Sequence, residues 1–127
     1  MSINAVTLIK LGGLANLGWL IFHCFFWRLF NWKSQLKRLN DTNSGVMQVL
    51  NLCLSFVFLI FAAVSLLYAV ELLNADLGRA MLIGIGSFWI LRMIEQPIFF
   101  GVSGVSNLFS LLFAATAACY LAAWALS

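Results

Sequence analysis

Charge is scarce in this sequence of 127 residues: aspartate, glutamate, lysine and arginine make up 9% of it, whereas hydrophobic residues make up 64%. Soluble domains are about half apolar and about a quarter charged. A soluble chain of this length has too little interior to bury so many apolar side chains. We therefore expect part of its surface to lie in a lipid bilayer. The net charge of +3, gathered mainly in one short segment, gives no basic surface for nucleic acid.

The sequence also lacks the residue groups that common cofactors and active sites require. Cys24, Cys53 and Cys119 are far apart in apolar segments, which disfavours a zinc site or a disulfide framework. His23 is the only histidine, so one chain cannot supply two histidine ligands to haem. No phosphate-binding glycine loop, H-E-x-x-H motif, nucleophile elbow or pair of carboxylates within one apolar segment is present. We expect no cofactor and no metal, and an enzyme is the least supported functional class.

Four apolar segments are long enough to cross a bilayer, which takes about 20 residues of helix. They extend over residues 5–27, 46–73, 77–96 and 104–126. The short connection at 74–76 predicts a hairpin of the second and third helices, and Pro97 predicts that the third helix ends or kinks there. The sequence thus predicts one domain, residues 1–127: an all-α integral membrane protein with four transmembrane helices in an antiparallel bundle.

The basic residues predict an orientation. Four of them, Arg28, Lys33, Lys37 and Arg38, lie between the first two spans, against only one acidic residue, Asp41. By the positive-inside rule the loop 28–45 is cytoplasmic and both termini lie outside. We expect a bacterial inner-membrane protein with periplasmic N- and C-termini.

The same connection, here called the basic segment (residues 28–38), has a helical period. Leu29, Trp32, Leu36 and Leu39 recur at helical spacing, and the cations occupy other faces. One interpretation is a short amphipathic helix on the membrane surface, with Arg28, Lys33, Lys37 and Arg38 bound to anionic headgroups. The alternatives are a simple topology signal with an aromatic belt, or an extension of the first helix.

Small and polar side chains form stripes along the predicted helices, as expected where membrane helices pack together. The first span has such a stripe at Gly12, Asn16, Trp19 and His23, and the third span has Ala80 and Gly84 four residues apart. The stripe of the second span comprises Gln48, Asn51, Ser55, Phe58, Ala62, Ser65 and Ala69. A ladder of small residues in the fourth span comprises Ser106, Ser110, Ala114, Ala118 and Ala122. This ladder predicts a helix interface, within the chain or in a homo-oligomer or larger membrane complex.

Polar side chains from all four spans reach a similar depth near the predicted cytoplasmic boundary, whereas the outer half has few. The candidate ligand-binding residues at this depth are His23, Gln48, Asn51, Arg92, Glu95, Gln96 and Asn107. This one-sided distribution predicts a bundle that opens as a cup toward the cytoplasm.

Arg92 has two interpretations. Glu95 and Gln96 follow it at helical spacing, so the three can form a self-satisfied cluster that holds helix ends together. Alternatively, Arg92 keeps donors free for an anionic or carbonyl-bearing ligand. In either case we expect Arg92 about one turn from the cytoplasmic interface, where its side chain can reach the headgroups.

These features favour an accessory, structural or ligand-binding membrane subunit. The alternative is a small oligomeric transporter or channel-like module for a small molecule, lipid or proton. A transporter should contain a polar, water-accessible cavity between its helices. An accessory subunit should instead have a closed centre and an outward-facing stripe of small residues.

Overall fold

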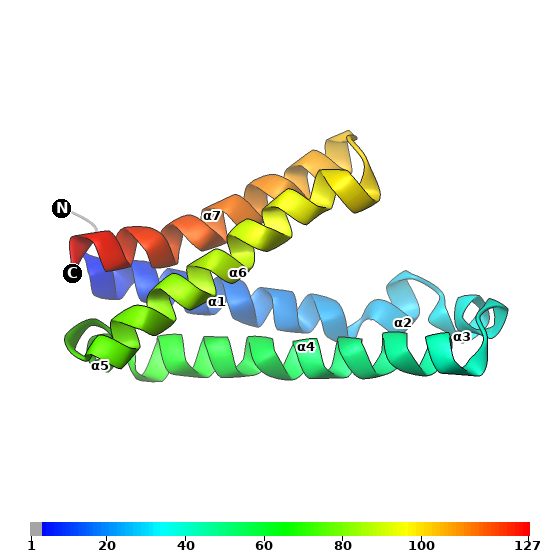
Figure 1. Ribbon diagram of the computed structural model, residues 1–127, viewed down its shortest axis with the longest axis horizontal. Helices are drawn as coiled ribbons and strands as arrows, with labels where there is room; N and C mark the ends of the chain where they lie inside the picture. The colour runs from blue at the N-terminus through cyan, green and yellow to red at the C-terminus, as the bar shows by residue number, and fades with distance from the viewer. Residues whose placement is uncertain (1–3) are drawn as a thin grey trace.

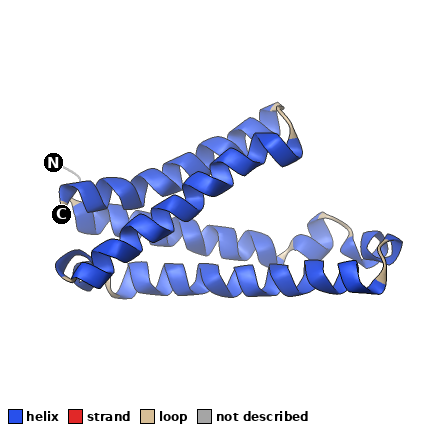
Figure 2. Cartoon of the chain, viewed as in Figure 1, coloured by secondary structure: helices blue, strands red, loops and turns tan. Residues whose placement is uncertain are grey.

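The computed structural model describes residues 4–127, and within this range the chain is helical throughout, with short connections and no strand (Figure 2). The four helices long and apolar enough to cross a membrane are α1 (Ala5–Cys24), α4 (Asp41–Leu67), α6 (Asp76–Phe100) and α7 (Gly104–Leu126). The short elements α2 (Phe26–Leu29), α3 (Trp32–Gln35) and η1 (Leu36–Arg38) link α1 to α4, and α5 (Ala69–Asn74) links α4 to α6. The predicted all-α architecture with four such helices is confirmed.

The helices form two antiparallel pairs, α1 with α4 and α6 with α7, which meet where α1 packs on α7 (Figure 1). All four helices lie together at the end of the molecule that holds the start of α1, the end of α7 and α5, here called the terminal end. Toward the opposite end the α6–α7 pair diverges from the α1–α4 pair. We call this opposite end the basic end, because α2, α3 and η1 carry the basic segment there.

Three of the long helices begin at a side chain that caps the free N–H groups of the first turn. Asn4 accepts a hydrogen bond from the N–H of Thr7 at 2.8 Å, and Asn40 accepts one from Asn43 at 2.7 Å. Ser103 caps α7 in the same way. Such caps fix where a helix starts, so the polar residues that flank the apolar segments set the helix boundaries.

The third predicted span differs from the structure at its end. The helix continues through Pro97 to Phe100 and ends at Gly101, whose φ of 76° suits glycine. Proline has no N–H to offer the carbonyl of Met93 one turn earlier. The hydroxyl of Ser110 on α7 donates to that carbonyl instead, at 3.1 Å. Because the helix extends past Pro97, Arg92 lies about two turns from its end rather than one.

The second predicted span is divided in the structure. Helix α4 ends at Leu67, and Tyr68, which is not helical, separates it from α5. The inward-facing stripe continues across this break, because Phe58, Ala62, Ser65 and Ala69 are all buried. The predicted stripe of α1 is also confirmed as inward-facing at Gly12, Asn16 and Trp19.

The predicted pair of small residues in the third span does not face the interior of the bundle. Ala80 and Gly84 are exposed, and the buried glycines of α6 are Gly78 and Gly86. A single step of four occurs on several faces of one helix, so this short pattern did not determine the face.

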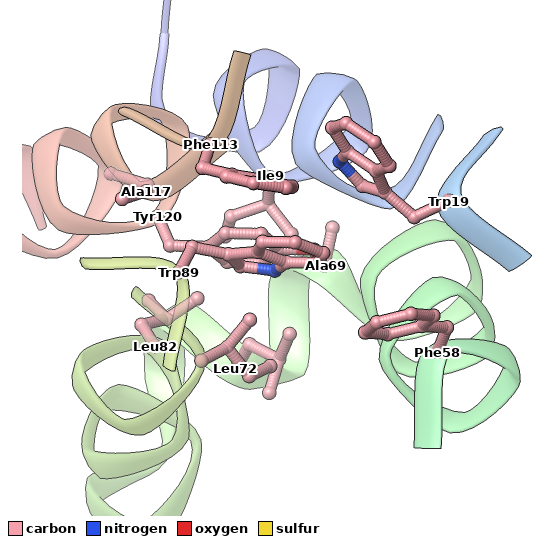
Figure 3. Packing of buried hydrophobic residues seen from close by; sticks show 12 residues of the cluster. Ile9, Trp19, Phe58, Ala69, Leu72, Leu82, Trp89, Phe113, Ala117 and Tyr120 are labelled. Atoms are coloured by element: carbon pink, nitrogen blue, oxygen red, sulfur yellow. The ribbon is translucent and has the colours of Figure 1, made fainter. Parts of the chain in front are cut away.

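The centre of the bundle contains one large ring from each of the four long helices (Figure 3). We call Trp19, Phe58, Trp89 and Phe113 the aromatic layer. Ring centroids lie 5.7 Å apart for Trp19 and Trp89, 5.2 Å for Phe58 and Trp89, and 4.7 Å for Trp19 and Phe113. These distances are typical of favourable aromatic packing, so this layer joins the two helix pairs.

Candidate functional site

His23 and Asn51 form a polar pair between α1 and α4 on the basic side of the aromatic layer. His23 Nδ1 and Asn51 Oδ1 are 2.9 Å apart, and Asn51 Nδ2 donates to the backbone carbonyl of His23 at 3.3 Å. Because an amide oxygen only accepts, His23 Nδ1 carries the proton and donates. The ring is thereby held with Nε2 as its acceptor nitrogen.

A small pocket of about 250 Å³ lies beside this pair. Its walls include His23, Asn51, Gln48 and Ser55 from the predicted polar faces. The side-chain nitrogen of Gln48 is already bonded to Ser44, at 3.2 Å from both its carbonyl and its hydroxyl. The structure therefore brings three of the seven candidate ligand-binding residues, His23, Gln48 and Asn51, to one place.

Arg92, Gln96 and Ser106 form a second polar chain, between α6 and α7. Arg92 Nη2 donates to Gln96 Oε1 at 3.0 Å, and Gln96 Nε2 donates to Ser106 Oγ at 3.2 Å. The Ser106 hydroxyl donates in turn to the carbonyl of Gly101 at 2.7 Å. A hydroxyl has only one proton, so Ser106 must accept from the amide nitrogen of Gln96, which turns the amide oxygen toward Arg92.

The guanidinium of Arg92 also lies over two aromatic rings. Its central carbon is 4.6 Å from the ring centroid of Phe113 and 5.5 Å from that of Phe100. Glu95 is half-buried, and the structure gives no salt bridge between it and Arg92 among residues 4–127. The expected Arg92–Gln96 contact is thus present, whereas Glu95 stays outside the chain of hydrogen bonds.

The two polar clusters lie on different helix pairs, with the aromatic layer between them. His23 contacts Phe58 edge-on at a centroid distance of 5.0 Å, and Arg92 lies over Phe113 on the other side. No hydrogen bond between described residues joins the clusters. Asn107 is exposed near the start of α7, where its backbone N–H bonds to Ser103. The arrangement is therefore two separate polar clusters rather than one continuous polar lining.

The structure contains a third polar cluster, at the centre of the bundle. None of its residues is among the candidate ligand-binding residues predicted from the sequence. Asn16 Nδ2 donates to Tyr120 Oη at 2.8 Å and to the carbonyl of Gly12 at 2.9 Å, and Asn16 Oδ1 accepts from Trp89 Nε1 at 3.2 Å. Tyr120 Oη is 2.7 Å from Ser65 Oγ. Asn16, Ser65, Trp89 and Tyr120 are all fully buried. We call these four residues the central network.

Each of the four long helices contributes one member to the central network. The Ser65 hydroxyl donates to the carbonyl of Phe61, so the Tyr120 hydroxyl donates to Ser65. Within residues 4–127 no buried side-chain nitrogen or oxygen lacks a hydrogen-bond partner. A Cβ placed on Gly12 would lie 2.6 Å from the Tyr120 ring, so glycine is what lets that ring reach Asn16. The network fills the space between the helix pairs.

The sequence indicated two of the four members of the central network. Asn16 and Ser65 lie on predicted inward stripes, whereas Trp89 and Tyr120 count as apolar in a hydropathy pattern. A buried indole or phenol generally needs a hydrogen-bond partner. A polar residue on an inward stripe, together with an aromatic donor in another span, is the pattern that could have indicated it.

The ladder of α7 lies at the border of the face that packs within the chain. Ser106 is buried, Ser110, Ala114 and Ala122 are half-buried, and Ala118 is exposed. The face that α7 buries most deeply is instead formed by Phe113, Thr116, Ala117, Tyr120 and Ala123. Only Ser106 and Ser110 make interhelical hydrogen bonds, both to α6 or its end.

An apolar groove of about 410 Å³ lies along the surface between α1 and α7. Four small side chains line it: Ala15, Gly18, Ala115 and Cys119. The larger lining residues are Trp19, Phe22, Phe109, Leu112 and Thr116. Trp19 Nε1 and Thr116 Oγ1 are bonded to each other at 3.4 Å, so the groove presents an apolar surface.

The basic segment folds into three short helical turns instead of one amphipathic helix. Asn31 has left-handed backbone angles, with a φ of 51°, and this interrupts the helical path between α2 and α3. Trp32 and Leu36 are buried, as their spacing predicts, whereas Leu29 and Leu39 are exposed. The candidate headgroup-binding residues are all exposed: Arg28, Lys33, Lys37 and Arg38.

No group of three or more histidine, cysteine, aspartate or glutamate side chains that could hold a metal ion occurs among the described residues 4–127. Cys24 and Cys53 are exposed and Cys119 is half-buried, and all three are free thiols. Comparison of the chain with protein-family models, with curated proteins and with solved structures finds no match in any of the three.

Proposed function

We propose that this protein is an accessory or structural subunit of a membrane assembly. The observation that carries the proposal is the closed centre of the bundle, where the central network bonds all four long helices to one another. A transporter with its path through one chain needs water-accessible polar groups between the helices. Here the polar groups of the centre are fully buried and bond one another.

The groove between α1 and α7 is the proposed docking surface. Membrane helices associate where small residues let their backbones approach closely. Ala15, Gly18, Ala115 and Cys119 supply such a surface on the outside of the bundle. The partner is a transmembrane helix, from a second copy of this chain or from a larger membrane complex.

Photocrosslinking at neighbouring positions of α7 tests this role. Leu112 lines the groove, whereas Leu111, beside it in sequence and 66% exposed, does not. A photoreactive benzoylphenylalanine at 112 should give a discrete protein adduct in native membranes, and the same residue at 111 should not. Absence of any protein adduct from position 112 would contradict the accessory role.

Thiol accessibility separates the accessory role from the transporter alternative. In a background without the three native cysteines, Ser65→Cys should resist a water-soluble thiol reagent, because Ser65 is fully buried. Ser55→Cys is the matched control, since Ser55 lines the pocket beside His23. Rapid modification of Ser65→Cys would favour a transporter with a water-filled centre.

The proposed orientation places the basic end in the cytoplasm and both termini outside, in a bacterial inner membrane. Exposed Arg28, Lys33, Lys37 and Arg38 support this placement through the positive-inside rule and through attraction to anionic headgroups. In intact cells an impermeant thiol reagent should label Ser127→Cys and leave Lys37→Cys unlabelled. The reverse pattern would invert the proposed topology.

A further inference from the structure

Arg92 is a half-buried charged side chain of α6 that hydrogen bonding and ring contacts hold in place without a salt bridge among residues 4–127. The chain has four carboxylate side chains, Asp41, Glu71, Asp76 and Glu95. The first lies at the start of α4 and the next two at the terminal end, and the structure pairs none of the four with Arg92. Its positive charge therefore has no salt-bridge partner among residues 4–127, and Glu95, three residues further along α6, attracts it only at longer range.

The guanidinium is nevertheless well positioned. Gln96, held by Ser106, accepts from one of its N–H groups, and the rings of Phe113 and Phe100 lie against it. A guanidinium has five N–H donors, and among residues 4–127 the structure gives a protein acceptor to only one of them. The remaining donors keep the fork geometry that matches two oxygens of one oxyanion.

Exposed apolar side chains lie on the same side of α6 as Arg92. Phe99 and Phe100, about two turns further along the helix, are 74% and 66% exposed, and the Phe100 ring lies against the guanidinium. The exposed cations of the basic segment lie at the same end of the molecule and attract anionic lipid to it. The oxyanion most abundant beside such a surface is the phosphate group of a phospholipid.

We propose that Arg92, positioned by Gln96, binds the phosphate oxygens of an anionic phospholipid. Gln96 acts as a positioning residue, because its amide fixes one edge of the guanidinium and leaves the others free. The lipid chains lie along the exposed apolar surface of Phe99 and Phe100. This inference is independent of the groove between α1 and α7, and either proposal can fail without the other.

The test measures thermal unfolding of the delipidated full-length protein in detergent, titrated with dioleoyl phosphatidylglycerol or with dioleoyl phosphatidylcholine. Phosphatidylglycerol should raise the unfolding temperature more than phosphatidylcholine. Arg92→Gln should weaken the apparent affinity for phosphatidylglycerol on the order of tenfold, since it removes charged hydrogen bonds. Arg28→Gln, a matched exposed cation, should keep most of the response.

Gln96→Glu provides a second test if Arg92→Gln fails to fold. A carboxylate at position 96 gives Arg92 a salt-bridge partner within the chain, which offsets the loss of the hydrogen bond donated to Ser106. This variant should therefore fold and should lose the phosphatidylglycerol response. An undiminished response in both Arg92→Gln and Gln96→Glu would overturn the proposal. So would a response lost in Arg28→Gln and retained in Arg92→Gln.

Glycerol phosphate distinguishes the two sources of the same chemistry. A bilayer lipid requires both the phosphate and its chains, so glycerol phosphate alone should give no shift at concentrations where phosphatidylglycerol saturates. A shift of equal size with glycerol phosphate, absent in Arg92→Gln, would overturn the lipid as the ligand and assign the site to a soluble phosphate ester.

Discussion

The two halves of this bundle use polar side chains in opposite ways. At the centre and toward the terminal end, Asn16, Ser65, Trp89 and Tyr120 join all four long helices and bond one another. Toward the basic end, the His23 pair and the Arg92 chain stay on separate helix pairs. This difference indicates that a polar residue in a membrane bundle can have one of two roles. It can hold helices together, in which case we call it a fastener, or it can remain available to bind a ligand. Which one it is depends on whether its hydrogen-bonding capacity is used up inside the chain.

Asn16→Leu should break this comparison most strongly, because it removes the residue that bonds both Trp89 and Tyr120. Their indole N–H and one side of the phenol would be left unpaired in a fully buried site. We expect the free energy of unfolding to fall by about 2–3 kcal/mol, measured by denaturant titration in mixed micelles. Asn107→Leu is the control, since Asn107 is exposed and should change it by less than about 0.5 kcal/mol. Equal effects of the two variants would contradict the fastener role.

Tyr120→Phe removes one hydroxyl from the same network and should have a smaller effect. The phenol bridges Asn16 and Ser65, so its loss should cost about 1 kcal/mol of unfolding free energy. Ser65→Ala should add little in the Tyr120→Phe background, because both changes remove one shared bond. Tyr68→Phe, at an exposed tyrosine, provides the baseline. Fully additive losses would show that Ser65 and Tyr120 are not coupled.

The Ser110 hydroxyl allows a sharper test of an interhelical bond. Ser110→Ala should cost about 0.5–1 kcal/mol, because the Met93 carbonyl then has no donor. In the Pro97→Ala background, residue 97 regains its own N–H for that carbonyl, so the same change should cost measurably less. The double-mutant cycle measures this coupling. An unchanged cost in both backgrounds would mean that Pro97 and Ser110 act independently.

Arg92→Met should have the smallest effect on the empty protein. It loses the bond to Gln96 and two ring contacts, and it removes a half-buried charge that forms no salt bridge among residues 4–127. These terms oppose each other, so we expect the unfolding free energy of the delipidated protein to change by less than about 1 kcal/mol. A loss as large as that of Asn16→Leu would place Arg92 among the fasteners instead.

The helices and most of their inward faces followed from the sequence. The length of an apolar segment sets whether it can cross a bilayer, and helical spacing sets which residues share a face. For this reason the stripe through Phe58, Ala62 and Ser65 was predicted correctly. Ala80 and Gly84 do not face the interior, and a pair of small residues is too short a pattern to identify one face.

The end of α6 and the bonding of the polar residues depended on tertiary contacts. The local rule for Pro97 holds for an isolated helix, but Ser110 from α7 satisfies the carbonyl that proline leaves free. Helical periodicity predicted that Asn16 lies on the inner face of α1. It did not predict the alignment of α1 with α7 that brings Tyr120 to Asn16. Arg92 had two local partners within reach, and Gln96 is the one that Ser106 holds from another helix.

The bond between Ser110 and Met93 also bears on how the protein enters a membrane. Helix α6 has the lowest mean hydropathy of the four candidate spans, 1.4 in its most apolar window, and it carries Arg92. On its own it would bring an unpaired carbonyl into lipid, together with a cation that only Gln96 of the same helix hydrogen-bonds, which is costly in hydrocarbon. Helix α7 supplies the missing hydroxyl. We therefore expect α6 and α7 to enter the bilayer together, after both have been synthesised.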